Sequence, residues 1–258
     1  GQVPTHLIGN DAFQEVDIVG ITRPCTKHNY LVKSVADLAR TVKEAFFLAR
    51  SGRPGPVLID IPKNVASGRG VYEPPGDVYL RSYNPTYQPH RKQLNEVARL
   101  IEEARQPVIF AGGGVLRSGG SEALTRLARR TMIPVTASLM GLGAFPGSDP
   151  LFLGMIGMHG TYAANMSTGA CDLLLAVGVR FDDRVTGKTD LFASQAKIVH
   201  IDIDPTSIRK NVQVGIPVVG DCRISLQLLD EMVTDARLAG LADRRAPWLA
   251  RIAEWKRS

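Results

Sequence analysis

Short, wholly apolar runs alternate with amphipathic stretches along the chain from residue 91 onward. Runs without polar alternation are typical of strands that are buried on both faces of a sheet. Between them, apolar side chains recur at helical spacing, as they do from Leu94 to Ala104. Because parallel neighbours need crossovers of this length, the pattern predicts an α/β fold with a doubly wound parallel sheet. The predicted strands are Val108–Ala111, Ile133–Ala137, Leu173–Val177, Lys197–Ile203 and Ile216–Val219.

The first third of the chain carries a shorter version of the same pattern. A short strand is predicted at Asp17–Thr22, and a second, more apolar one at Val57–Ile61. Between them, Ser34 is a candidate helix cap, and Gly52 stands where a helix that begins there would end. Strand, helix and strand together indicate the end of one α/β domain rather than a whole domain.

Composition predicts how the chain is divided. Residues 65–90 lose all periodicity and collect Gly, Pro and Tyr, which is typical of a linker. The last residues lead away from the second domain, and we expect a linker toward a further element there. The expected divisions are a truncated first domain at 1–75, a linker at 76–90, a complete second domain at 91–239 and a second linker at 240–258.

The totals exclude several classes of protein. No run of about 18 apolar residues is present, so no membrane-spanning helix is expected. The net charge is +6, but the basic residues are scattered and only 6% of residues are aromatic, which argues against a nucleic-acid partner. Cys25, Cys171 and Cys222 lie far apart and predict neither a disulfide framework nor a metal site. The chain begins at Gly1 without a signal-peptide pattern, and we expect an intracellular segment of a longer protein.

The most informative stretch is CDLLLAVGVRFDDRVTGK, residues 171–188. A buried strand ends there at Gly178 and is followed by a cluster of charges that includes Arg180, Asp183 and Arg184. Open α/β sheets bind their ligands where parallel strands end in this way. The alternative is a solvated loop with two surface ion pairs.

Other strand ends suggest which ligand could bind. Gly112–Gly114 would let a backbone approach a pyrophosphate, although glycine triplets often only form turns. Asp202 could accept a hydrogen bond from a ribose hydroxyl or could cap a following helix. Arg53 and Arg180 could bind phosphate or form ordinary ion pairs, and His159 could contact a ring or be a simple loop residue. A dinucleotide along this edge explains more of these residues than any single structural role does.

Several stretches carry a close resemblance to a known family. GQVPTHLIGNDAFQE, RPGPVLIDIPKN, LMGLGAFP, GMHGTYAAN, GVRFDDRVTGK and IVHIDID resemble the catalytic large subunits of acetolactate synthase (acetohydroxyacid synthase), which are thiamine-diphosphate enzymes. The resemblance implies that residues 1–75 are the C-terminal part of a pyrimidine-binding domain and residues 91–239 a Rossmann-like, FAD-binding central domain. A diphosphate-binding domain would follow Ser258. The family's catalytic Glu would precede Gly1 and its Mg²⁺ ligands would follow Ser258, so the fragment alone is expected to be inactive.

The resemblance also implies an activity, cofactors and partners. These transferases condense pyruvate with a second 2-keto acid, pyruvate or 2-ketobutyrate, and release CO₂ in the biosynthesis of isoleucine, leucine and valine. The implied cofactors are thiamine diphosphate, Mg²⁺ and FAD, of which FAD is largely structural. Full-length subunits would form homodimers or homotetramers and could bind a regulatory small subunit. The implied location is the bacterial cytoplasm, with a plastid as the alternative.

Site residues are implied position by position. Phe13 and Gln14 would line the active site, and Lys63 and Met158 would stand at the mouth of the substrate channel. Arg184 would bind the carboxylate of the second substrate. The positions implied for FAD are Arg53, Gly112, Gly113, Gly114, Ser138, Leu139, Met140, Gly157, His159, Gly178, Arg180, Asp183, Val185, Asp202, Ile203, Asp221 and Cys222.

Two alternatives remain beside this interpretation. One is another FAD-carrying thiamine enzyme, of the pyruvate oxidase or glyoxylate carboligase type, against which the Asp182-Asp183-Arg184 run argues. The other is a non-catalytic flavin-binding module. A truncated domain has no reason to precede a self-sufficient module, which argues against the second alternative.

Overall fold

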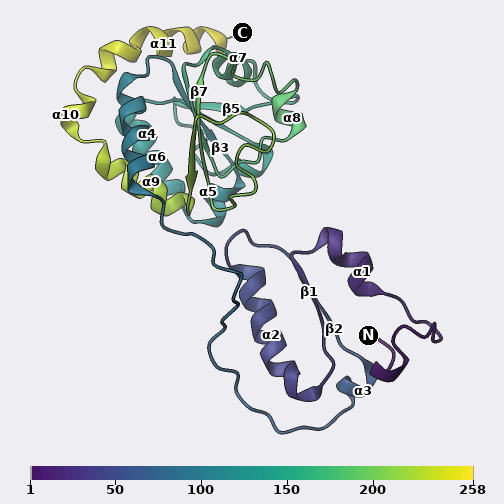
Figure 1. The fold of residues 1–258 in the computed structure, drawn as a ribbon. Helices are drawn as coiled ribbons and strands as arrows, with labels where there is room; N and C mark the ends of the chain where they lie inside the picture. The colour runs from purple at the N-terminus through teal and green to yellow at the C-terminus, as the bar shows by residue number, and fades with distance from the viewer. Residues whose placement is uncertain (1, 258) are drawn as a thin grey trace. The chain divides into compact units, whose positions relative to one another are not determined.

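The computed structural model describes residues 2–257. The chain forms two compact units, with the boundary in the sequence between Pro85 and Thr86 (Figure 1). Each unit has its own sheet, of two strands in the first and six in the second. No helix among the described residues is long and apolar enough to cross a membrane.

The first unit is built on a parallel pair of strands joined by one helix. Strand β1 (His28–Leu31) pairs with β2 (Val57–Asp60), with His28 opposite Val57, and α2 (Val35–Arg50) forms the crossover. Ser34 caps α2 by accepting a hydrogen bond from the Ala36 N–H at 3.3 Å, as predicted, and Gly52 has a positive φ of 53° just after the helix ends. The short remaining elements are η1 (Thr5–Leu7), α1 (Ile18–Thr22), η2 (Arg23–Cys25) and α3 (Lys63–Ala66).

The predicted strand at Asp17–Thr22 is wrong, because this stretch forms helix α1. The Asp17 carboxylate accepts a hydrogen bond from the Gly20 N–H at 2.8 Å and so caps the first turn. The strand that pairs with β2 begins at His28 instead, in a sequence, His-Asn-Tyr-Leu, without the apolar character that marks a strand. Capping at Asp17 gives this stretch a helical turn although four of the five residues that follow it are β-branched and favour strands.

The second unit contains a six-stranded sheet in which every neighbouring pair is parallel. The strand order is β5-β4-β3-β6-β7-β8, so the predicted doubly wound α/β fold is confirmed. The strands are β3 (Pro107–Ala111), β4 (Val135–Ala137), β5 (Phe152–Met155), β6 (Leu173–Val177), β7 (Lys197–Asp202) and β8 (Ile216–Val219). The strand β5, four residues long with a φ of 89° at Gly154, was not predicted from the sequence.

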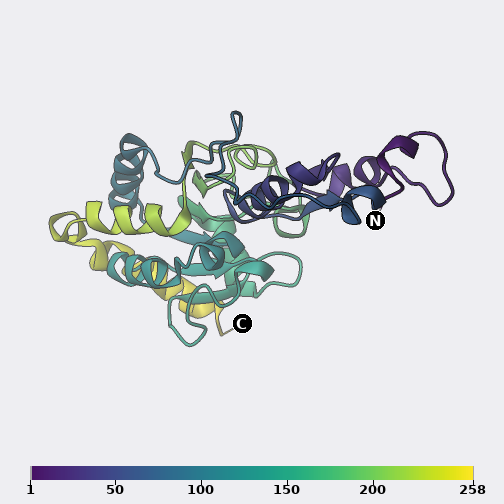
Figure 2. The same cartoon turned by 90° about the horizontal axis from the view of Figure 1, so that it is seen from below.

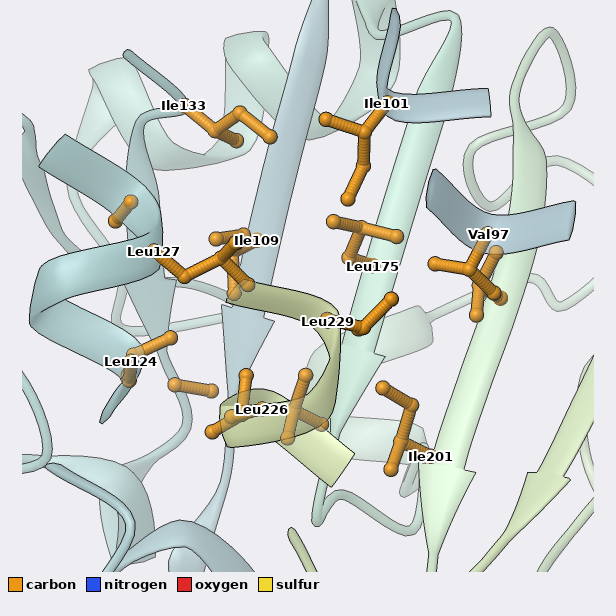
Figure 3. Close-up of a cluster of buried hydrophobic side chains, with 14 of the residues drawn as sticks. Val97, Ile101, Ile109, Leu124, Leu127, Ile133, Leu175, Ile201, Leu226 and Leu229 are labelled. Atoms are coloured by element: carbon orange, nitrogen blue, oxygen red, sulfur yellow. The ribbon is translucent and has the colours of Figure 1, made fainter. Parts of the chain in front are cut away.

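Helices cover both faces of this sheet, and alternate residues of the strands separate two cores. Ile109, Leu175 and Ile201 point to the face covered by α4, α6 and α9, whereas Val108 and Leu174 belong to the core on the opposite face (Figure 3). The same layers can be followed in Figure 2. The helices are α4 (Arg91–Glu103), α5 (Gly113–Arg117), α6 (Ser121–Thr131), η3 (Leu139–Gly141), α7 (Tyr162–Ala170), α8 (Asp183–Thr186), α9 (Cys222–Met232), α10 (Asp235–Leu238) and α11 (Leu241–Trp255).

Helix α11 occupies the range expected as a second linker, residues 240–258. Trp248 and Ile252 are buried in the second core, and the Trp248 indole N–H donates to the Pro107 carbonyl at 3.2 Å. Arg245 is fully buried, and its guanidinium donates to the carbonyls of Ile101 and Thr131 at the C-terminal ends of α4 and α6. The tail is therefore an integral layer of the second unit.

Candidate functional site

The carboxyl edge of the six-stranded sheet has a topological switch point between β3 and β6. From β3 the chain moves outward through β4 to β5, and from β6 it moves outward through β7 to β8. Connections leave these two strands in opposite directions, which opens a crevice where doubly wound sheets hold their ligands. Every cofactor position predicted in the second unit follows the end of one of these six strands or forms its last residue.

Glycines allow the chain segments after β3 and β6 to pack directly against each other. The Gly112 N–H donates to the Val177 carbonyl at 2.9 Å, and the Gly114 N–H donates to the Gly178 carbonyl at 3.1 Å. A Cβ on Gly112 would overlap the Gly178 carbonyl oxygen, and one on Gly114 would lie 2.6 Å from the Gly178 Cα. The protein itself therefore requires these glycines. The sequence suggested the approach of a ligand or a simple turn for them, and neither includes this contact between two strand ends.

The segment after β4 presents apolar side chains beside this glycine contact. The Ser138 N–H donates to the Ala111 carbonyl at 2.9 Å, which ties the segment to the end of β3. Leu139 and Met140 are 69% and 65% exposed, and a Cβ on Gly113 would lie 3.1 Å from the Met140 carbonyl oxygen. Large exposed apolar groups next to a close backbone contact form a surface that an aromatic ring system can cover.

Two predicted catalytic residues, Met158 and Arg184, meet at a turn after β5. Gly157 has a φ of 106°, and a Cβ there would lie 2.6 Å from the Arg184 carbonyl oxygen. That same carbonyl accepts a hydrogen bond from the Met158 N–H at 2.9 Å. The Met158 side chain is 64% exposed and the Arg184 side chain 74%, so an apolar group and a cation stand on adjoining segments. His159, the next residue, is also exposed.

The charged turn after β6 remains accessible. Arg180 lies 3.5 Å from Asp182, and Arg184 lies 3.9 Å from Asp183, with both arginine side chains at least 70% exposed. Ion pairs of this kind add about 0–1 kcal/mol to stability, so they leave the guanidinium groups available. Asp182 caps α8 by accepting from the Arg184 N–H at 3.1 Å, and Val185 packs against the second core.

At the ends of β7 and β8 the side chains are more enclosed. Asp202 accepts from the Asp204 N–H at 2.9 Å, Ile203 is half-buried beside it, and no helix begins after Pro205. The alternative role of Asp202 as a helix cap is therefore wrong. Asp221 caps α9 by accepting from the Ile224 N–H at 3.0 Å. Cys222 belongs to the first core, where burial raises the pKa of its thiol, so only its backbone remains for a ligand.

The remaining predicted residues lie in the first unit. Phe13 is 88% exposed, and Gln14 follows with a φ of 59°. Glu15 closes this loop by accepting hydrogen bonds from the N–H groups of Gly9 and Ala12, and these bonds lower the pKa of its carboxyl. Lys63 begins α3, and Arg53 lies in the exposed loop before β2.

Two residues beneath the charged turn were not predicted from the sequence. His200 of β7 is fully buried, and its Nε2 lies 2.7 Å from the Val179 carbonyl oxygen. Asn211 donates to the Phe181 carbonyl at 2.8 Å. His200 lies within an apolar strand sequence, and Asn211 lies in a loop without periodicity, so neither stood out in the sequence. A polar residue inside a wholly apolar strand is the signal that could have identified His200. Among residues 2–257, no cluster of three or more His, Cys, Asp or Glu side chains could hold a metal.

A match to a family model identifies the group of proteins to which this chain belongs. Residues 94–229, just over half of the chain, match the family model described as "Thiamine pyrophosphate enzyme, central domain". The chain belongs to the thiamine pyrophosphate enzymes. The match begins in α4 and ends in α9, so it includes the whole of the six-stranded sheet of this thiamine pyrophosphate enzyme.

Individual relatives agree with this assignment. The chain is 46% identical to an acetolactate synthase large subunit of Haemophilus influenzae over 99% of its length, and 45% identical to the isozyme 3 large subunit of Escherichia coli over the same share. It covers 45% of each of these two proteins, so it spans less than half their length. A solved structure from Mycobacterium smegmatis, described provisionally as a thiamin diphosphate-dependent enzyme, superposes with a TM-score of 0.73 at 26% identity, over 91% of this chain and 44% of that one.

Proposed function

We propose that this chain is part of the large subunit of an acetolactate synthase, which joins two 2-keto acids with loss of CO₂. The observation that carries the proposal is identity of 45–46% to acetolactate synthase large subunits across almost the whole chain. The second keto acid would be pyruvate or 2-ketobutyrate, in the biosynthesis of branched-chain amino acids.

The contact between Met158 and Arg184 supports this choice of substrate. A short 2-keto acid has a carboxylate at one end and a methyl or ethyl group at the other. Arg184 offers an exposed guanidinium, which suits a carboxylate, and Met158 offers an exposed thioether chain on the adjoining segment. We assign the carboxylate of the incoming second substrate to Arg184 and the channel mouth to Met158 and Lys63, with Phe13 and Gln14 lining the active site. Thiamine diphosphate, when bound, supplies the carbanion chemistry of the reaction.

We further propose that FAD lies along the carboxyl edge of the six-stranded sheet. The exposed Leu139 and Met140 side chains suit an aromatic ring system, and the exposed Arg180 suits a phosphate. Asp202 stands at the end of β7, where a ribose hydroxyl can donate to it. The carboxyl edge thus offers an apolar, a cationic and an acidic group in one crevice, which is the combination that a flavin dinucleotide needs.

The remaining expectations complete the proposed enzyme. Mg²⁺ and the diphosphate group would be held by residues outside this sequence. Relatives named "large subunit" support a small regulatory subunit as a partner, and we propose homodimers or homotetramers of full-length subunits in the bacterial cytoplasm.

The test uses the full-length subunit that contains this chain, purified and supplied with thiamine diphosphate, Mg²⁺, FAD, pyruvate and inorganic phosphate in air-saturated buffer. Acetolactate is converted by acid to acetoin and measured colorimetrically, while oxygen uptake and acetyl phosphate report a pyruvate oxidase. Acetoin in proportion to pyruvate consumed, without oxygen uptake, is expected. Oxygen-dependent acetyl phosphate as the main product would reject the acetolactate synthase assignment in favour of the oxidase.

A further inference from the structure

The turn that carries Arg180 is strained and needs support from its surroundings. Gly178 has a φ of 63° and Phe181 a φ of 52°, so two of four successive residues are left-handed. Phe181 is a bulky residue for which this conformation is a genuine outlier. Such a backbone persists only where neighbouring groups determine it, and strain of this kind gathers at binding sites.

His200 supplies the first support from below. It is fully buried on β7, its Nε2 lies 2.7 Å from the Val179 carbonyl oxygen, and its ring meets the Phe181 ring edge to face at 5.0 Å between centroids. A carbonyl can only accept, so the Nε2 atom carries the proton and the Nδ1 atom is an acceptor. The Nδ1 atom is buried and has no hydrogen-bond partner. The hydrogen bond from Nε2 to the Val179 carbonyl therefore explains a histidine here better than the unsatisfied Nδ1 atom does.

Asn211 supplies the second support from the loop between β7 and β8. Its side-chain amide donates to the Phe181 carbonyl at 2.8 Å and to the Arg180 carbonyl at 3.3 Å. Together with His200, it engages the carbonyls of three successive residues, 179, 180 and 181. Side chains thus hold the backbone on both sides of the Arg180 Cα, while the Arg180 side chain itself stays 70% exposed.

We propose that His200 and Asn211 are positioning residues for flavin binding. This inference rests on the proposed FAD site. They fix the turn 178–181 in the strained form that presents Arg180 to a flavin phosphate, and they touch no ligand themselves. A binding-competent form that is only partly populated weakens the apparent affinity by the fraction populated, so loss of either support should raise the dissociation constant for FAD.

The test measures FAD affinity in the full-length subunit, stripped of flavin and titrated by fluorescence quenching, alongside thermal melting of the FAD-free protein. His200→Leu keeps the bulk and removes the donor, and His200→Gln restores an N–H that can reach the Val179 carbonyl. Asn211→Ala removes the second support. Trp248→Phe is the matched control, because it removes one buried hydrogen bond, to the Pro107 carbonyl, at the opposite edge of the same sheet.

We expect His200→Leu to weaken FAD binding about tenfold, which corresponds to the free energy of one buried hydrogen bond. Asn211→Ala should weaken it about threefold because its amide is partly exposed. His200→Gln should recover most of the affinity, and Trp248→Phe should lower the melting temperature without changing affinity. Equal losses of affinity in His200→Leu and Trp248→Phe, or unchanged affinity in His200→Leu, would overturn the positioning role. Absence of FAD binding by the unmodified subunit would reject the FAD site itself, which is a separate result.

Discussion

The two edges of the six-stranded sheet use arginine in opposite ways. At the amino edge, Arg245 is fully buried, and its guanidinium donates hydrogen bonds to carbonyls at the ends of α4 and α6. At the carboxyl edge, Arg180 and Arg184 are 70% and 74% exposed and meet only neighbouring aspartates at 3.5 Å and 3.9 Å. Burial lowers the pKa of Arg245 to about 10, the charge of Asp172 opposes that shift, and the hydrogen bonds of the guanidinium go to carbonyls.

This difference indicates which charges serve the fold and which serve a ligand. A buried cation with its donors satisfied has nothing left for a small molecule, and its removal leaves carbonyls without partners. An exposed cation on a strained turn adds little to stability but keeps its donors free. The comparison predicts that substitutions at the amino edge change stability alone, and those at the carboxyl edge change binding and catalysis.

Replacing Arg245 should have the largest effect on stability. Arg245→Met keeps much of the side-chain volume but leaves the Ile101 and Thr131 carbonyls buried without a donor. We expect a loss of about 3–5 kcal/mol in the free energy of unfolding, measured by urea denaturation of the second unit's transition. Arg99→Met, on the exposed face of α4 with the half-exposed partners Glu96 and Glu103, is the control and should cost less than about 1 kcal/mol. FAD affinity in the folded Arg245→Met protein should be unchanged, and a large loss there would contradict the division between the edges.

Arg184→Lys should produce the largest effect on catalysis. Lysine keeps the charge but loses the planar fork that can bind a carboxylate through two parallel hydrogen bonds. We expect carboligation to fall roughly ten- to a hundredfold, which corresponds to about 1.5–3 kcal/mol, while release of CO₂ from the first pyruvate falls less. The measurement is the ratio of acetolactate formed to CO₂ released by the full-length enzyme. A normal ratio in a well-folded variant would show that Arg184 does not bind the second substrate.

The sequence was sufficient to predict the sheet and the edge at which the site residues gather. Wholly apolar runs such as Leu173–Val177, which are short and end at a glycine, indicate buried strands, and parallel pairing then brings their carboxyl ends together. The first-unit strand β1 was missed because its residues lack that apolar signature, and the apolar edge strand β5 was missed because Gly154 interrupts a run of only four residues beside a loop rich in Gly and Pro. Periodicity reports burial, so it fails for strands that are only partly buried.

Contacts between distant segments could not be predicted from the sequence. The clash that forbids a side chain at Gly112 comes from Gly178. The hydrogen bonds that Arg245 donates to backbone carbonyls depend on how α11 crosses the ends of α4 and α6. In the range 240–258 the helical spacing of Trp248, Ile252 and Trp255 was interpreted as the lead into a further element, yet Trp248 and Ile252 are buried within the second unit itself. A few large side chains at the right spacing can bury a helix that composition alone does not mark.

Arg180→Ala tests the carboxyl edge more gently than Arg184→Lys does. Arg180 is 70% exposed, so solvent screens its interaction with a phosphate and the loss should lie near the low end of a charged hydrogen bond. We expect the dissociation constant for FAD to rise about tenfold, with the melting temperature of the FAD-free protein within about 1 °C of the unmodified protein. Flavin fluorescence titration measures this, and Arg117→Ala, an exposed arginine of α5, provides the control. Equal affinity in Arg180→Ala and the unmodified protein would remove Arg180 from the site.

The smallest expected effect is a pH dependence of stability that His200 introduces beneath the carboxyl edge. Burial lowers the pKa of His200 below its ordinary value of 6.5, although the nearby Val179 carbonyl opposes the shift. The unfolded chain therefore binds a proton at His200 before the folded protein does. Stability is independent of this group above about pH 6.5 and falls as the pH drops from there toward the folded-state pKa, by at most about 1.4 kcal/mol per pH unit.

Because Asp202 lies 3.9 Å from the imidazole and other carboxylates also titrate in acid, the comparison must be made between two proteins. Urea unfolding at pH 7.5, 6.5 and 5.5 should show that the unmodified chain loses more stability than His200→Gln over the lower interval. Over the upper interval the losses should differ by less than about 0.4 kcal/mol, because protonation of the unfolded chain has only begun there. Parallel losses over both intervals would mean that His200 accepts a proton in the folded state as readily as in the unfolded one. The buried, unpartnered Nδ1 atom would then have to be reached by water, and the rigid support assigned to the turn 178–181 would be wrong.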